Sequence, residues 1–175
     1  MISPKFLNYF VVALLFLTPL VRENVVAQVP NGVTVADENF VVYNNLRLRT
    51  VENVSATSKV STPSDLIFFP LTPLEDNLAK ELNSHWIWSE TTLEQINSYS
   101  PFIFRTKKSA KNEEVKVLLQ VNSSGRLNGV KVLGKVDKGL QERLDYVLRK
   151  LPDCKPIPGH STYGTQTFEL VIKKQ

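Results

Sequence analysis

Cysteine is almost absent from this chain of 175 residues, which contains Cys154 alone. A single cysteine excludes an intrachain disulfide. A lone thiol in an oxidising compartment is usually buried or paired with another chain. Because Cys154 lies where the chain should pack beneath a sheet, we expect it to be buried.

Glycine and histidine are also scarce, with seven glycines and two histidines. The glycines do not recur at the spacing of a phosphate-binding loop, which disfavours nucleotide chemistry. His85 and His160 lie far apart in the sequence, without the short spacing of zinc ligands. We therefore expect no metal site and no cofactor.

Catalytic signatures are missing around the residues that could carry them. Ser161 follows His160, and Asp153 is near, but no Gly-x-Ser-x-Gly turn exposes a nucleophile. Cys154 stands in a Cys-Lys-Pro stretch rather than at a helix start, where the pKa of a thiol would be lowered. The sequence predicts a protein that is not an enzyme.

Strong charge of one sign is lacking as well, since the formal net charge is +4. The densest basic cluster is Lys107-Lys108 with Lys111, and Glu113-Glu114 follows at once. A basic stripe that could track phosphates is absent, so we expect a solvated loop and no nucleic-acid partner.

The one long apolar run is too short to be a typical membrane span. It covers residues 6–21, follows Lys5, contains Pro19 and precedes a small-residue site that ends at Ala27. A spanning helix needs about 20 apolar residues, whereas this order of charge, apolar run and small residues is typical of a secretory signal. We expect residues 1–27 to be a cleaved signal peptide and the protein to be periplasmic; an uncleaved inner-membrane anchor is the alternative.

Three segments follow the signal. Residues 28–64 have short apolar alternations, at 40–43 and 46–48, and indicate one or two weak strands or an extended arm or linker. Residues 65–112 indicate a helical lead-in. Thr72-Pro73-Leu74-Glu75 is a capping box, in which the Thr hydroxyl and Glu carboxylate satisfy free amides, so a helix should run from there to about residue 83. A second helix should begin after Thr91 and end before Pro101.

Residues 85–88 alternate like a strand, which would place Trp86 and Trp88 on one face. We favour the core for this pair, because large aromatic side chains are usually buried. An exposed pair that stacks on sugar or holds a peptide is the alternative, and would suit a secreted hydrolase or ligand-binding protein.

Residues 113–175 carry the clearest pattern. A one-faced strand over 115–121 is followed by the turn Asn122–Gly125, a return strand over 127–136, a helix that begins after Asp137 and a final strand over 165–173. The fold class is therefore α+β, with a small antiparallel sheet, made of a hairpin plus a closing strand, packed on an amphipathic helix. One or two helices precede this unit.

This C-terminal stretch resembles the TonB C-terminal domain over about residues 113–174. The family shows the same order of strand, polar turn with Gly, return strand, helix, Pro-containing loop and closing strand. The matching residues are Val115–Gly125, Val130-Lys131-Val132, Lys155-Pro156 with Gly159, and Phe168–Ile172.

The resemblance implies a periplasmic module that adds an extended segment of a partner to a sheet edge, or that associates with itself in this way. By the same resemblance, the last strand is the expected edge. The residues implied to bind the partner are Thr165, Thr167, Phe168, Glu169, Leu170, Val171, Ile172 and Lys173. A membrane-anchored energy transducer is the alternative function; residues 28–64 lack the long Pro-rich spacer of such proteins, having only Pro30 and Pro63.

Overall fold

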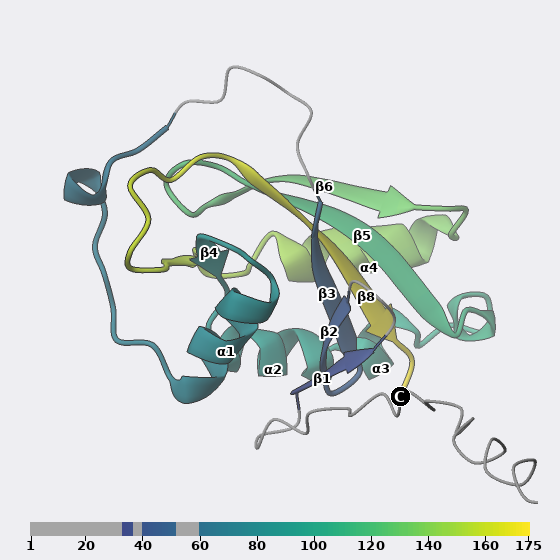
Figure 1. Cartoon of the computed structure of the whole chain (residues 1–175). Coiled ribbons are helices and arrows are strands. Elements are labelled where there is room, and N and C mark those ends of the chain that lie inside the picture. Colours follow the sequence, from purple (N-terminus) through teal and green to yellow (C-terminus); the bar gives the residue numbers. More distant parts are fainter. Residues whose placement is uncertain (1–32, 37–39, 52–59) are drawn as a thin grey trace, which may run out of the picture.

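The computed structural model describes residues 33–36, 40–51 and 60–175, so the expected signal peptide lies outside the described residues. The expected α+β class is confirmed, with helices packed against an antiparallel sheet (Figure 1). In the described part of the chain, no helix combines the length and apolar character that a membrane crossing requires.

The main sheet has six strands, whereas the sequence predicted three in residues 113–175 and left open one or two weak strands in residues 28–64. Their order across the sheet is β1-β2-β3-β8-β5-β6, and every neighbouring pair is antiparallel. A separate two-stranded ribbon pairs β4 with β7. The strands are β1 (Val33–Ala36), β2 (Phe40–Tyr43), β3 (Leu46–Val51), β4 (Trp86–Ile87), β5 (Glu114–Val121), β6 (Leu127–Leu133), β7 (Lys155–Pro156) and β8 (Gln166–Lys173).

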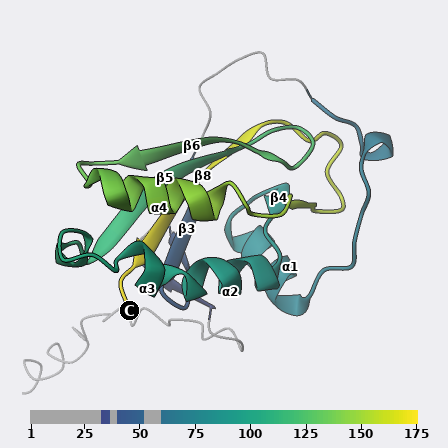
Figure 2. The ribbon, with the colours of Figure 1, turned by 180° about the vertical axis from the view of Figure 1, so that it is seen from behind.

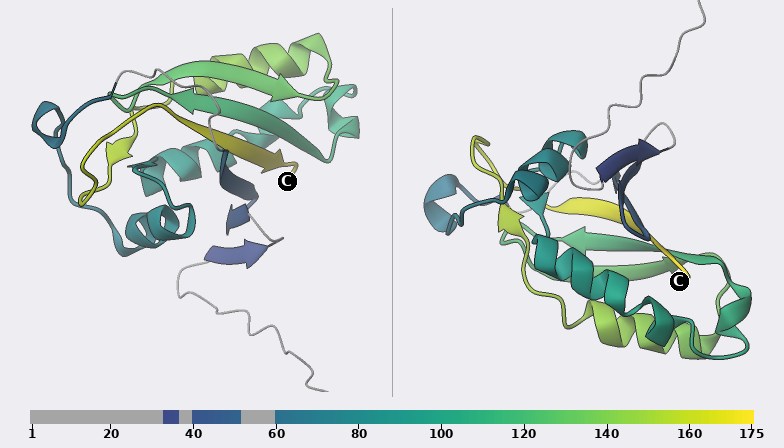
Figure 3. Two further views of the ribbon diagram at one scale, coloured as in Figure 1. Left: turned by 45° about the horizontal axis from the view of Figure 1, so that its top comes forward. Right: turned by 90° about the horizontal axis from the view of Figure 1, so that it is seen from below.

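Helices α2, α3 and α4 lie along one face of the sheet (Figures 2 and 3). Alternate residues of β5 are buried in the core, which explains its one-sided apolar pattern, whereas β8 is buried continuously over residues 168–172. The helices are α1 (Pro73–Glu81), α2 (Glu90–Ser98), α3 (Ser100–Ile103) and α4 (Lys138–Leu148), with short 3₁₀ turns η1 (Pro63–Asp65) and η2 (Ser109–Lys111).

The capping box at the start of α1 forms as predicted. The amide of Glu75 donates to the Thr72 hydroxyl at 3.2 Å, and the amide of Thr72 donates to the Glu75 carboxylate at 3.0 Å. These bonds satisfy two amides that the helix itself leaves unpaired. α1 ends at Glu81, close to the predicted end.

The predicted start of the second helix is wrong, whereas its end, at Ser98, agrees with the prediction. α2 begins at Glu90, because Ser89 rather than Thr91 is its cap and accepts a hydrogen bond from the amide of Thr92 at 3.2 Å. Pro101 does not terminate the helical segment but stands near the start of α3. Proline is tolerated there because amides in the first turn have no helical partner.

The C-terminal hairpin and helix follow the prediction closely. Gly125 in the turn has a φ of 84°, a conformation that favours glycine. β6 ends at Leu133, earlier than predicted, because Gly134 turns the chain with a φ of 80°. The Asp137 carboxylate caps α4 by accepting from the Leu140 amide at 3.1 Å.

The segment expected to be an arm belongs to the sheet where the structure describes it. β3 pairs with β8 over six residue pairs. Four side chains of β2 and β3 are buried in the core that also includes α1, α2, α4, β5 and β8; they are Val41, Tyr43, Leu46 and Leu48. Residues 65–112 and 113–175 share this core, so the boundary expected between them does not separate two cores.

Candidate functional site

The last strand is not an edge of the sheet, so the prediction that it offers one to a partner is wrong. β8 pairs with β3 on one side and with β5 on the other. The residues that were expected to bind there all lie in or next to this interior strand: Thr165, Thr167, Phe168, Glu169, Leu170, Val171, Ile172 and Lys173. The physical reason is that β3, from the segment read as an arm, already occupies that edge.

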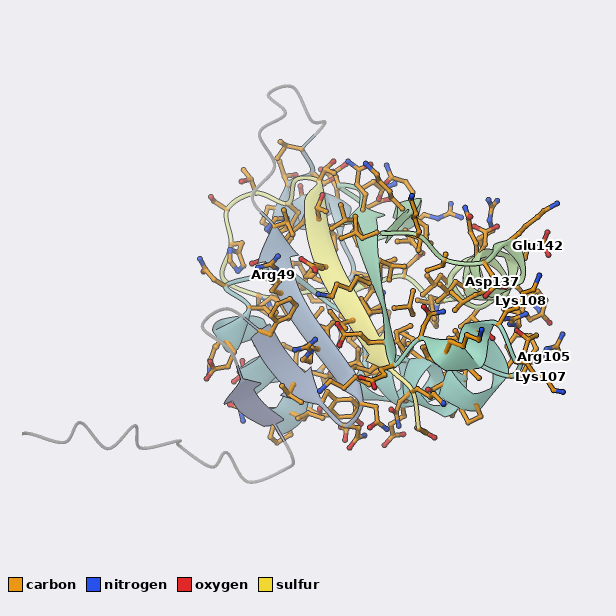
Figure 4. The ribbon with its side chains drawn as sticks, turned by 90° about the vertical axis from the view of Figure 1, so that its right-hand side faces the viewer. Arg49, Arg105, Lys107, Lys108, Asp137 and Glu142 are labelled. Atoms are coloured by element: carbon orange, nitrogen blue, oxygen red, sulfur yellow. The ribbon has the colours of Figure 1, made fainter. Side chains whose placement is uncertain are left out.

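Side-chain contacts hold β3 against β8. The guanidinium Nε of Arg49, labelled in Figure 4, donates to the carboxylate of Glu169 at 2.8 Å. Glu169 is 5% exposed, and the same guanidinium lies 4.6 Å from the ring centre of Phe40. The Thr50 hydroxyl donates to the carbonyl of Leu82 at 2.9 Å, which fixes the end of β3. These contacts indicate permanent pairing rather than a loosely covering segment.

The described sheet has two end strands, β1 and β6. No described strand pairs with the outer side of β6, and this is the edge that lies beside α4. Val130 and Val132 lie opposite Leu119 and Val117 of β5, on the face that α4 covers, and are partly buried. A further residue on this strand, Lys131, is exposed. β6 therefore combines free backbone groups with a half-buried apolar face.

Two hollows follow the line between β6 and α4. The larger has a volume of about 530 Å³, and the smaller, at the start of β6, has a volume of about 270 Å³. We call the larger one the β6–α4 groove. It is lined by Val130, Lys131, Val132, Lys138, Gln141, Glu142, Asp145 and Arg149.

The rim of the β6–α4 groove carries opposite charges in pairs. Arg149 Nε lies 2.7 Å from a carboxylate oxygen of Asp145, and Lys138 Nζ lies 3.7 Å from one of Glu142. All four side chains are well exposed, so these pairs contribute little to stability. They are free to exchange partners with a polar segment that enters the groove.

The densest basic cluster is solvated, as expected. Lys107, Lys108 and Lys111 are all exposed. In the view of Figure 4, Lys107 and Lys108 project on the same side of the molecule as Asp137 and Glu142. This mixed surface lacks the unbroken positive potential that follows a phosphate backbone.

Trp86 and Trp88 are core residues, as favoured from the sequence. Both are 1% exposed or less. Trp86 Nε1 donates to the carbonyl of Gly164 at 2.9 Å, and the Trp88 ring lies 4.8 Å from the ring of Phe168. The alternative, an exposed tryptophan pair that lines a binding pocket, is therefore wrong.

The fold brings the two histidines together, which the sequence did not indicate. The ring centres of His85 and His160 are 5.9 Å apart, and the Tyr163 ring packs against both. His85 Nε2 donates to the carbonyl of Gly164 at 2.9 Å. Burial lowers the pKa of His85 and outweighs the raising effect of the hydrogen bond to Gly164, and the nearby His160 adds a smaller lowering effect. No spacing rule could have paired them, because the loop after β7 supplies the second ring.

Cys154 is buried, as expected. Burial, with the nearby charge of Asp153, raises the pKa of the thiol well above its usual range. A thiol in this state is a poor nucleophile, because the thiolate is the reactive form. Its position beneath Gly125, whose carbonyl accepts from the Cys154 amide at 2.8 Å, gives it a packing role.

Within residues 33–36, 40–51 and 60–175, no three or more His, Cys, Asp or Glu side chains gather as metal ligands. The chain matches no family model, no curated protein and no solved structure.

Proposed function

We propose that this protein is an exported, non-enzymatic interaction module that binds an extended segment of a cell-envelope protein by strand addition to β6. The observation that carries the proposal is the open β6 edge with the β6–α4 groove beside it. It keeps the mode of binding implied by the resemblance to the TonB C-terminal domain but moves it to the opposite side of the sheet.

Strand addition divides affinity and selectivity between backbone and side chains. Free N–H and C=O groups of β6 would bond the incoming backbone. Alternate side chains of the incoming strand would enter the β6–α4 groove, beside Val130 and Val132, while the others would lie near Lys131. The preferred segment therefore alternates apolar residues with polar or acidic ones.

The β6 edge carries the features that limit indiscriminate pairing. Lys131 is exposed on the strand, and the pairing with β5 shifts between Gln120 and Val121, which is a bulge. Edge lysines and bulges discourage aggregation through open edges. A symmetric dimer centred on Lys131 would set two lysines opposite each other, which is unfavourable. A different protein is therefore the better occupant than a second copy.

Photo-cross-linking in cells tests this proposal. A photoreactive amino acid at Lys131 should form an adduct with an envelope protein, whereas the same group at the exposed Glu81 of α1 should not. Successive backbone N–H groups of a strand point to opposite sides, so the N–H of either Val130 or Leu133 points away from β5. Of the variants Val130→Pro and Leu133→Pro, one therefore removes an outward N–H and leaves the hydrogen bonds between β5 and β6 intact.

The proline variant that keeps the wild-type melting temperature should lose the adduct. An adduct that survives in this folded variant contradicts strand addition, and so does equal labelling from residues 131 and 81. Absence of any adduct at residue 131 in intact cells also overturns the proposal.

A further inference from the structure

The geometry of the loop after β7 and the residue before β4 points to a metal site: we propose that His85 and His160 together bind one divalent transition-metal ion, with Cu(II) bound most tightly. This inference is independent of the proposed function, because the two rings lie outside the β6–α4 groove.

The separation of the rings fits a shared ion. An imidazole nitrogen binds zinc at about 2.0–2.1 Å and its ring centre lies roughly 1.1 Å further back, so two rings on one ion have centres roughly 4.5–6.4 Å apart. The centres of His85 and His160 are 5.9 Å apart, with their planes at 63°. This separation allows the two rings to share one ion once the side chains turn from their edge-to-face arrangement.

His85 makes the hydrogen bond that metal-bound histidines commonly make through their second ring nitrogen. Its Nε2 must carry the hydrogen, because its partner at 2.9 Å is the carbonyl oxygen of Gly164, which only accepts. Nδ1 is then the nitrogen with a free lone pair. Donation of the second ring nitrogen to a carbonyl fixes the tautomer and raises the ligand strength of a histidine.

The loop that carries His160 is held in place by its own contacts. The Tyr163 hydroxyl donates to the Ile157 carbonyl at 2.6 Å, and the Ile157 amide donates to the His85 carbonyl at 3.0 Å. Tyr163 also exchanges two backbone hydrogen bonds of 2.9 Å with Ser61. A preformed loop lowers the ordering cost of bringing the second ligand to the ion.

The donor set selects the class of ion. Imidazole nitrogens suit zinc, copper, iron and nickel, and at a given site copper is bound most tightly among the divalent ions. A closed structural zinc site needs four protein ligands, whereas His160 is exposed and leaves the remaining positions to water. The site is therefore an open, two-histidine site that exchanges its ion with the solvent.

Titration of the purified protein with copper sulfate tests the inference. Trp86 serves as the reporter, because its ring lies 5.8 Å from that of His85 and bound Cu(II) quenches a nearby indole. We expect saturation at one equivalent, and an electron paramagnetic resonance spectrum with coupling to two imidazole nitrogens. The variant His160→Ala should weaken binding at least about tenfold, the scale on which even outer partners of a metal site act.

Two further variants keep the result clear. Ser161→Ala alters an exposed neighbour in the same loop and should bind as the wild type does. His85→Gln retains a side-chain amide that can donate to the Gly164 carbonyl, so the variant should fold normally. It should lose the binding of the first equivalent of copper. If His160→Ala and Ser161→Ala bind copper equally, or if quenching never saturates, the site does not exist and the ion binds elsewhere.

Discussion

The guanidinium of Arg49 in β3 and the carboxylate of Glu169 in β8 form an ion pair between adjacent strands whose residues are 120 positions apart in the sequence. The carboxylate is almost fully buried, whereas Arg49 is 38% exposed. The pair closes the side of β8 that a TonB-like mode of binding would use. We therefore place the proposed strand addition at β6, an end strand of the described sheet.

The variant Arg49→Ala should destabilise the protein, because it leaves the buried carboxylate of Glu169 without its charged partner. We expect a loss of about 1–2 kcal/mol of unfolding free energy, less than for a fully buried pair because Arg49 is partly exposed. Urea denaturation measures it. The matched control is Lys80→Ala, which removes an exposed pair with Asp76 and should cost less than about 0.5 kcal/mol. Equal losses in the two variants would contradict the proposed strength of the β3–β8 contact.

A fragment that starts at residue 113 should not fold, although its sequence reads as a complete unit. It lacks β3 and the buried side chains of β2 and β3, among them Leu46 and Leu48. Each fully buried leucine contributes about 1.5–3 kcal/mol, and a domain has only about 5–15 kcal/mol of net stability. Circular dichroism with thermal melting tests this: a cooperative transition in the fragment would show that the core is separable.

Stability should fall in acid through Glu75. This carboxylate is 1% exposed, lies 2.8 and 2.9 Å from Lys155 Nζ, and accepts from the amides of Thr72 and Glu90. Burial alone would raise the pKa of Glu75, but Lys155 and the two amides outweigh it and lower the pKa below its usual 4.5.

Because the folded-state pKa is lowered, the stabilisation is complete above the unfolded-state pKa and is lost as the pH falls through the folded-state value. Urea unfolding between pH 7 and pH 2.5 should therefore show a steep acid limb below about pH 4.5 in the wild type. The variant Glu75→Gln should lose about 2–3 kcal/mol at pH 7 and show a flatter acid limb. If the unfolding free energy of the two proteins fell equally steeply with pH, Glu75 would not be the cause of the acid destabilisation.

The variant Gly125→Ala should disturb the turn between β5 and β6 for two reasons. The residue has a positive φ, and a Cβ there would lie 2.7 Å from the backbone oxygen of Cys154 and 3.0 Å from the Trp86 ring. Gly134→Ala separates the two effects, since Gly134 has a φ of 80° with open space around it. We expect a loss of about 1 kcal/mol for Gly134→Ala from backbone strain alone and a clearly larger loss for Gly125→Ala. Equal values would mean that the contact with Cys154 relaxes freely.

The mature amino terminus should be Gln28 if the apolar segment is a cleaved signal. Edman sequencing or mass spectrometry of protein from fractionated cells measures it, and the protein should appear in the periplasmic fraction. A start at Met1 in the inner-membrane fraction would instead favour the anchored alternative.

Local features of the fold were predictable, because neighbouring residues specify them. The capping box of Thr72 and Glu75, the turn at Gly125 and the buried face of α4 follow from contacts within a few residues. The cap of α2 was misassigned because Ser89 and Thr91 are both good caps, and only packing selects between them.

Features that depend on long-range pairing were not predictable. The Leu46–Val51 segment alternates like a strand, but nothing within it indicates that β8 is its neighbour. The extra strand turned the expected edge into the middle of the sheet. The approach of His160 to His85 likewise depends on how the loop after β7 folds back, which no short-range pattern encodes.

The place of β8 has a consequence for the order in which the molecule forms. The strands before it build one hairpin ladder, β1-β2-β3, and the β5–β6 hairpin builds another, while β8 is the only strand of the described sheet that joins them. During synthesis, the two halves of the described sheet therefore remain unjoined until residues 166–173 have left the ribosome.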